Sequence, residues 1–184
     1  MTQRWGRIAS LLAVVLALVA GGCATHTRPR ATAGLLDLSG WSFSTEGAVS
    51  LQGTWQIYWH QLLTPQDLQG RHPPTPTGDI SVPGAWGGTR IGNLVLPRFG
   101  YATLQLKVLL PPDAGSVDAI YLRYACTAYR LWVNGAPVAA DGVVGTSRAT
   151  ETPQYLPHTT SSPRTAMWWT SSCGSPTSII AAVA

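Results

Sequence analysis

Ten residues in the middle of the chain, YATLQLKVLL at positions 101–110, decide the fold class. Apolar side chains occupy every second position from Ala102 to Leu110, and the positions between them are mainly polar. This two-residue period is that of a β-strand with one buried face. Pro111 and Pro112 end the strand, because proline has no N–H to donate to a neighbouring strand. The stretch therefore predicts a strand whose even-numbered side chains face a core.

The same pattern continues toward the C-terminus. A strand is expected around Ile120 and Leu122, and another from Tyr129 to Val133. Asn134-Gly135 then predicts a two-residue hairpin, because both residues tolerate a positive φ, with 137–140 as the returning strand. The expected core positions are Leu104, Leu106, Val108, Leu122, Leu131 and Val133.

Toward the N-terminus the elements are also short. Trp55, Ile57 and Trp59 share one face of a predicted strand, and Thr64-Pro65 predicts the start of a short helix that ends near residue 69. Residues 80–82 predict one more short strand. Short strands at this spacing, without a sustained helical period, predict an all-β fold over 35–157, an antiparallel jelly-roll β-sandwich.

The first 23 residues are typical of a secretory signal. Arg4 and Arg7 precede an apolar run, and small residues precede Cys23. The ending also resembles a bacterial lipoprotein signal, in which Cys23 would carry the lipid, and the alternative is an ordinary cleaved signal. Residues 24–34 then form a polar linker. We expect an exported, periplasmic protein, anchored to the membrane if Cys23 is lipidated.

The last part of the sequence, 158–184, lacks the strand pattern. Met167-Trp168-Trp169-Thr170 has nearly fixed codons, and the neighbouring reading frame can encode a run such as DVVDIVVRV, which has the pattern of a β-strand. We interpret 158–184 as a frameshifted, non-native tail, so that the sandwich would be incomplete at its C-terminus. Chance similarity between frames is the alternative.

The residues give no sign of catalysis. The four histidines have no metal-like spacing, and no nucleophile elbow or phosphate loop occurs. The net charge is +4, but without the two arginines of the signal 10 basic residues face 8 acidic ones, which does not indicate nucleic-acid binding. We therefore predict no enzyme activity, no cofactor and no metal site.

Aromatic residues are the remaining candidates for a binding site. The chain has 8 tryptophans, and Trp55, Trp59, Trp86 and Trp132 can each stack on a sugar or fill the core. For Trp55 and Trp132 the core is favoured. We predict Trp86, Arg130 and Asp141 as ligand contacts, because an aromatic ring flanked by a cation and an acid suits a polyhydroxylated ligand. Arg130 can instead pair with an acid at the edge of the core.

Several motifs in this order resemble a known family. The segment YRLWVNG at 129–135, about thirty residues after GYAT at 100–103, resembles galactose-binding-like domains, including the sugar-binding jelly roll of family 2 glycoside hydrolases. A longer set resembles the extracytoplasmic domain of bacterial seven-transmembrane receptors with diverse intracellular signalling modules. This set consists of LDLSGW at 36–41, LQGTWQIYW at 51–59, VPGAW at 82–86 and GVVGTS at 142–147.

The resemblance implies a ligand-sensing module, with a carbohydrate as the expected small-molecule partner. On this interpretation the chain is a truncated fragment of a membrane receptor that acts in signal transduction. The alternatives are a carbohydrate-binding ancillary domain of a glycoside hydrolase and a standalone lipoprotein. Downstream DNA distinguishes them, because a receptor continues into apolar spans of about 20 residues and a hydrolase into a catalytic domain.

Overall fold

The computed structural model describes residues 27–112, 119–121, 128–154, 159–161 and 177–183. Two short helices occur there, α2 (Phe43–Glu46) and α3 (Pro65–Gln69). The strands are β1 (Leu35–Asp37), β2 (Gly53–Trp59), β3 (Gly78–Val82), β4 (Arg90–Ile91), β5 (Leu94–Val95), β6 (Ala102–Leu109), β7 (Ala119–Tyr121), β8 (Tyr129–Val133), β9 (Ala136–Asp141), β10 (Thr159–Ser161) and β11 (Thr177–Val183).

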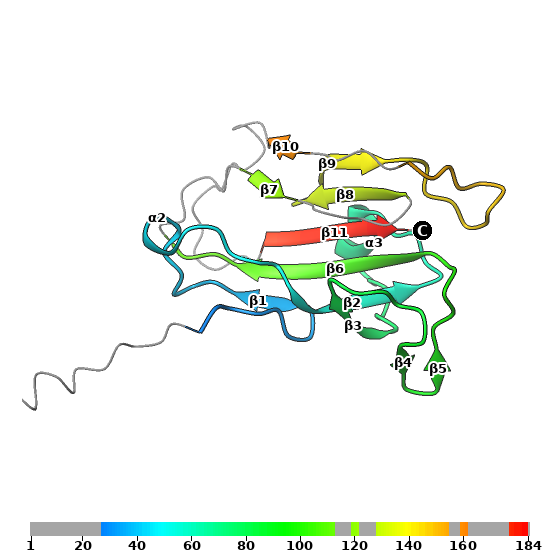
Figure 1. The fold of residues 1–184 in the computed structure, drawn as a ribbon, viewed down its shortest axis with the longest axis horizontal. Helices are drawn as coiled ribbons and strands as arrows, with labels where there is room; N and C mark the ends of the chain where they lie inside the picture. The colour runs from blue at the N-terminus through cyan, green and yellow to red at the C-terminus, as the bar shows by residue number, and fades with distance from the viewer. Residues whose placement is uncertain (1–26, 113–118, 122–127, 155–158, 162–176, 184) are drawn as a thin grey trace, which may run out of the picture.

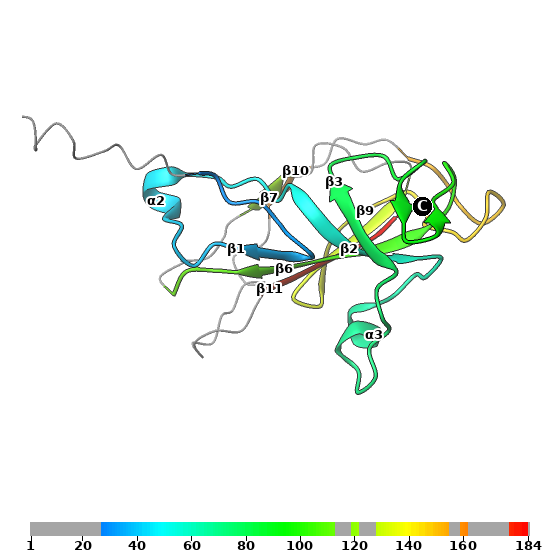
Figure 2. The ribbon, with the colours of Figure 1, turned by 90° about the horizontal axis from the view of Figure 1, so that it is seen from below.

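One large sheet organises the molecule. Its strands follow the order β3-β2-β6-β11-β8-β9, and β1 pairs with β6 beyond the end of β2 (Figure 1). Two small sheets, β10-β7 and β4-β5, lie on one side of the large sheet, and α3 lies on the other side (Figure 2). The all-β sandwich expected from the sequence is confirmed. It is not wholly antiparallel, because β1 runs parallel to β6.

The alternating segments occupy the positions that their patterns predict. β6 covers all but the first and last residues of the predicted strand, and Asn134 and Gly135 take φ values of 51° and 85° in the β8–β9 hairpin. The helix predicted after Thr64 is α3, whose first turn has a capping box between Thr64 and Asp67. Thr64 donates its backbone N–H to the Asp67 carboxylate, and this bond lowers the pKa of Asp67.

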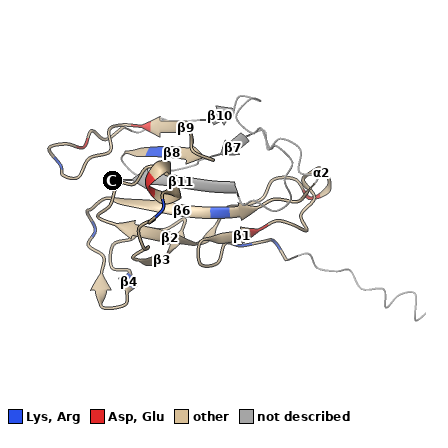
Figure 3. Ribbon diagram, turned by 180° about the vertical axis from the view of Figure 1, so that it is seen from behind, with Lys and Arg blue, Asp and Glu red and all other residues tan. Residues whose placement is uncertain are grey.

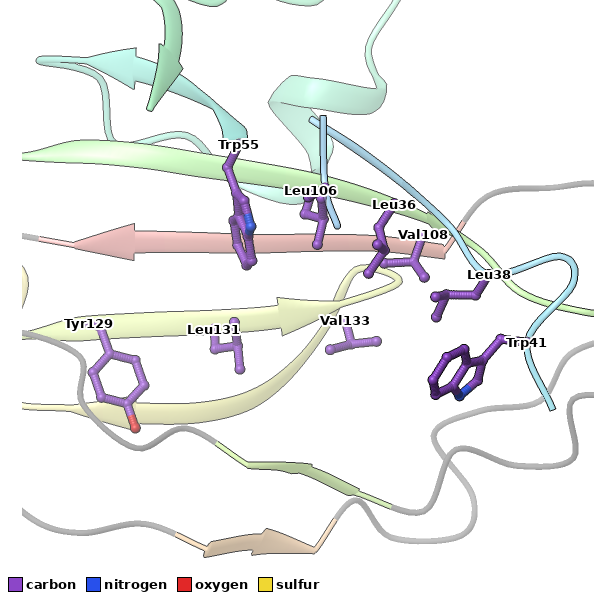
Figure 4. Packing of buried hydrophobic residues seen from close by; sticks show 10 residues of the cluster. Leu36, Leu38, Trp41, Trp55, Leu106, Val108, Tyr129, Leu131 and Val133 are labelled. Atoms are coloured by element: carbon purple, nitrogen blue, oxygen red, sulfur yellow. The ribbon is translucent and has the colours of Figure 1, made fainter. Parts of the chain in front are cut away.

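The main core covers the face of the large sheet that we call the core face. It extends from Tyr129 at one end to Trp41 at the other (Figure 4). Of the predicted core positions, Leu106, Val108, Leu131 and Val133 are buried and Leu104 is half-buried. Leu122 lies outside the described residues, as do Cys126 and Cys173. Segments 31–41 complete this core with Leu36, Leu38 and Trp41, all fully or nearly fully buried.

The opposite face of the sheet, which we call the α3 face, carries polar side chains that contact the segment before α3. Tyr58 donates its hydroxyl hydrogen to Gln105 Oε1 at 2.9 Å, and both side chains are buried. Thr103 Oγ1 donates to the Gln61 carbonyl and accepts the N–H of Leu63, each at 2.8 Å. These bonds attach the segment before α3 to β6.

Burial raises the pKa of Tyr58, which makes stability depend on alkaline pH. The ordinary tyrosine pKa is about 10, so the unfolded chain releases this proton at a lower pH than the folded chain does. The stabilisation is therefore complete below about pH 10 and is lost as the pH rises through the folded pKa. We expect the free energy of unfolding, measured by urea denaturation, to fall between about pH 9 and pH 11. The fall should be less steep in the Tyr58→Phe variant. A wild-type value that stays constant over this range contradicts the prediction.

The C-terminal part of the chain corrects an expectation. Residues after 157 were expected to add no strand, but β10 pairs with β7, and β11 lies between β6 and β8. Both flanking strands need a partner for their backbone groups, and the β-branched residues of TSIIAAV suit a strand. The frameshift itself concerns the gene and stays a prediction, which sequencing past codon 157 in all three frames tests.

Candidate functional site

Three loops meet at one end of the large sheet, which we call the loop end. β2 finishes there at Trp59 opposite Ala102, and β9 finishes there at Asp141 opposite Tyr129. The loops are 83–89, 96–101 and 142–154, and the β4–β5 hairpin projects beside them (Figure 1). Binding residues often lie on loops held by a rigid scaffold, so this end is the first place to look for a site.

Four aromatic side chains form a continuous row at the loop end, which we call the aromatic ladder. The Trp86 and Trp59 rings meet edge to face, with centroids 5.4 Å apart. The His60 ring stacks on Trp59 at 4.9 Å and on Tyr101 at 5.0 Å. Trp59 is buried, Trp86 and Tyr101 are half-buried and His60 is exposed, so the ladder passes from the core to the surface.

The backbone accounts for this arrangement. The β2–β6 register places His60 opposite Tyr101, and the His60 N–H donates to the Tyr101 carbonyl at 3.0 Å. His60 has a φ of 57°, an uncommon value for a residue with a side chain. Gly100 lies so close to the Trp59 ring that a Cβ there would collide with it. Glycine at this position therefore lets the loop cross the indole.

The Trp86 indole also contacts the loop 96–101, at Arg98. Its Nε1 donates to the Arg98 carbonyl at 3.2 Å, and a Cβ added to Gly87 would lie 3.0 Å from the Arg98 Cα. The residues on either side of Phe99 therefore each contact a tryptophan, Arg98 through its carbonyl and Gly100 through its close approach to Trp59. The Phe99 side chain itself is 73% exposed.

The loop 142–154 follows β9, at the opposite edge of the sheet from β2, and reaches residues 98–100. The Arg148 guanidinium carbon lies 4.7 Å from the centre of the Phe99 ring, a cation–π contact. Four strand spacings of about 4.8 Å, roughly 19 Å in all, separate Trp59 from Asp141 along the sheet. The Arg148–Phe99 contact thus joins two loops that the strands hold apart.

The three predicted ligand contacts do not meet at one point. Trp86 belongs to the aromatic ladder. Asp141 stands at the same end of the sheet, but it is 6% exposed and lies opposite Tyr129 on the core face. Burial and the Asp141 charge raise the pKa of Tyr129. Asp141 is thus placed among buried side chains, and its contact with a ligand stays a prediction.

Arg130 projects from the α3 face, because its neighbours Tyr129 and Leu131 point into the core. Figure 3 shows the blue segments of β8 and β6, which contain Arg130 and Lys107. Both side chains are exposed. Arg130 and Asp141 therefore lie on opposite faces of the sheet, and no single small ligand on the sheet contacts both.

The structure divides the tryptophans differently from the sequence-based expectation. Trp55 is in the main core, as expected, and its Nε1 donates to the Leu51 carbonyl at 2.8 Å. The expectation that Trp132 fills the core is wrong. It occupies the same face as Arg130 and is half-buried, since alternate residues of a strand point to opposite faces.

Four residues at the loop end were not predicted from the sequence: His60, Phe99, Tyr101 and Arg148. Pairing of 53–59 with 102–109 would have placed His60 beside Tyr101, because both residues adjoin the last pair. No comparable signal was present for Arg148, whose position depends on the course of a loop.

The described residues bear on two further features, a metal site and a membrane-spanning helix. Within these ranges no group of three or more histidine, cysteine, aspartate or glutamate side chains is placed to hold a metal. Nor does any helix there combine the length and apolar character that a membrane crossing needs. Stacking and hydrogen bonding are the chemistry that the loop end can provide.

No protein-family model matches the chain, and no curated protein sequence does. Among solved structures, a β-glucuronidase of Faecalibacterium prausnitzii is similar to it, with 21% sequence identity and a TM-score of 0.48. The superposition covers 73% of this chain and 20% of that chain. The chain thus spans a fifth of the length of that β-glucuronidase.

Proposed function

We propose that this chain is a glycan-binding module and that the loop end is its binding site. The observation that carries the proposal is the aromatic ladder, which runs from the buried Trp59 to half-buried Trp86 and Tyr101, with the exposed Phe99 in the loop next to it. The C–H faces of a sugar ring pack on aromatic faces, and Tyr and Trp also offer a polar edge for hydroxyl groups.

The rigidity of the site supports binding. The two neighbours of Phe99 contact tryptophans, Arg98 contacting Trp86 and Gly100 contacting Trp59. Arg148 covers one side of the Phe99 ring. A ring that is already ordered loses little conformational freedom when a ligand stacks on it. A phenylalanine that is 73% exposed also gains apolar burial on binding.

We further propose that the module works outside the cytoplasm, with residues 1–23 as its export signal and Cys23 as a lipid anchor. Such a module would present glycans either to a seven-transmembrane receptor, as its sensor, or to a glycoside hydrolase, as an ancillary domain. The module itself is proposed to bind without catalysis. Sequencing of the locus downstream distinguishes the two settings.

The test is a titration of intrinsic tryptophan fluorescence with a panel of oligosaccharides. At least one glycan is expected to change the emission, because Trp86 and Trp59 lie at the proposed site. Phe99→Ala should weaken binding about tenfold, which corresponds to the burial of one aromatic side chain.

Leu35→Ala is the matched control, since Leu35 is 42% exposed in β1, far from the loop end. It should leave affinity unchanged, and both variants should melt at the wild-type temperature. If no glycan alters the fluorescence, or if both variants weaken binding equally, the proposed site is wrong.

A further inference from the structure

The charges at the loop end are mainly positive. Arg90, Arg98 and Arg148 are exposed there, on β4 and on the two loops that meet at Phe99. Glu151, in the same loop as Arg148, is half-buried. Asp141 is buried on the core face. Three exposed arginine side chains can therefore contribute to a ligand site at the loop end.

The aromatic ladder itself positions two of these arginines. Trp86 Nε1 donates a hydrogen bond to the Arg98 carbonyl at 3.2 Å. This bond fixes the backbone from which the Arg98 side chain extends. Arg148 rests on the Phe99 ring at 4.7 Å. A guanidinium stacked on a ring keeps its N–H donors at its edge, where they can bind an anion.

We infer that the loop end binds an anionic glycan, with the sugar ring on Phe99 and the aromatic ladder and its acidic group on Arg98 and Arg148. The inference rests on the proposed function and specifies its ligand class. Arginine binds carboxylate and sulfate oxygens through paired, charge-assisted hydrogen bonds. A uronic acid and a sulfated sugar share this chemistry, and the two are tested separately.

The experiment compares glycans that differ only in charge. Polygalacturonate oligomers are titrated beside their methyl esters, and a sulfated oligosaccharide beside its desulfated form. At least one charged member is expected to bind about tenfold or more tightly than its neutral counterpart, which is the effect of one charge-assisted pair. The difference should shrink as salt rises, because these arginines are exposed.

Arg98→Gln and Arg148→Gln should each bring the ratio of charged-member affinity to neutral-member affinity closer to one. Arg71→Gln is the control, because Arg71 is exposed and follows α3 on the other side of the sheet. It should keep the wild-type preference.

The outcomes separate the two proposals. If charged and neutral members bind equally and the arginine variants change nothing, the anionic class is wrong and glycan binding stands. If no glycan of either kind binds, both proposals fail. Binding to phosphatidylglycerol vesicles without binding to any glycan overturns both, because the loop end would then recognise lipid headgroups.

Discussion

A chain that ends at residue 176 is expected to lose its cooperative unfolding transition. Such a chain lacks β11, which pairs with β6 along Ala102–Val108 and with β8 along Tyr129–Val133. Without it, the facing edges of β6 and β8 have unpaired backbone groups, and each unsatisfied group that stays buried costs about 1–3 kcal/mol. A domain has only about 5–15 kcal/mol of net stability, so the loss exceeds what the sheet can tolerate.

The measurement is urea denaturation followed by circular dichroism. A chain that ends at residue 183 retains every residue of β11 and serves as the control, which should unfold cooperatively. If the two chains unfold at the same urea concentration, β11 contributes nothing and the tail is foreign to the fold, as the sequence pattern suggested.

The second large effect is expected from Leu106→Ala in β6. Leu106 is 0% exposed and belongs to the main core, so its truncation leaves a cavity that the surrounding strands fill only in part. We expect a loss of about 2–5 kcal/mol in the free energy of unfolding.

Leu94→Ala makes the same chemical change at a side chain that is 39% exposed. It should change the free energy of unfolding by no more than about 0.5 kcal/mol. Chemical denaturation of both variants measures the difference. Equal losses would mean that Leu106 does not lie in a packed core.

The sequence predicted the elements that carry strict alternation. β2, β6 and β8 have it, and the Asn134-Gly135 turn confirms the hairpin because its φ values are those that such a turn requires. Alternation alone did not identify β11, in which Ile179 and Ile180 are adjacent apolar residues. A central strand is selected by the partners on both sides, and those partners lie far away in the sequence.

The site was less predictable than the sheet for the same reason. Strand parity alone separates Arg130 from Asp141, since Arg130 pairs with Ala140 and not with Asp141. Periodicity says nothing about loops, however. The contact between Phe99 and Arg148 depends on how two loops cross the end of the sheet, and neither loop has a repeating pattern.

The central position of β11 also bears on how the protein reaches its native state. Its pairing with β6 joins residues about 70–80 positions apart, which is a high contact order and favours slow folding. Until 177–183 have been synthesised, the sheet has no middle strand, and β6 and β8 have nothing between them. Late pairing of this kind leaves the nascent chain without its complete sheet during synthesis. For a protein proposed to leave the cytoplasm, β11 would then join the sheet only after passage through the secretion channel.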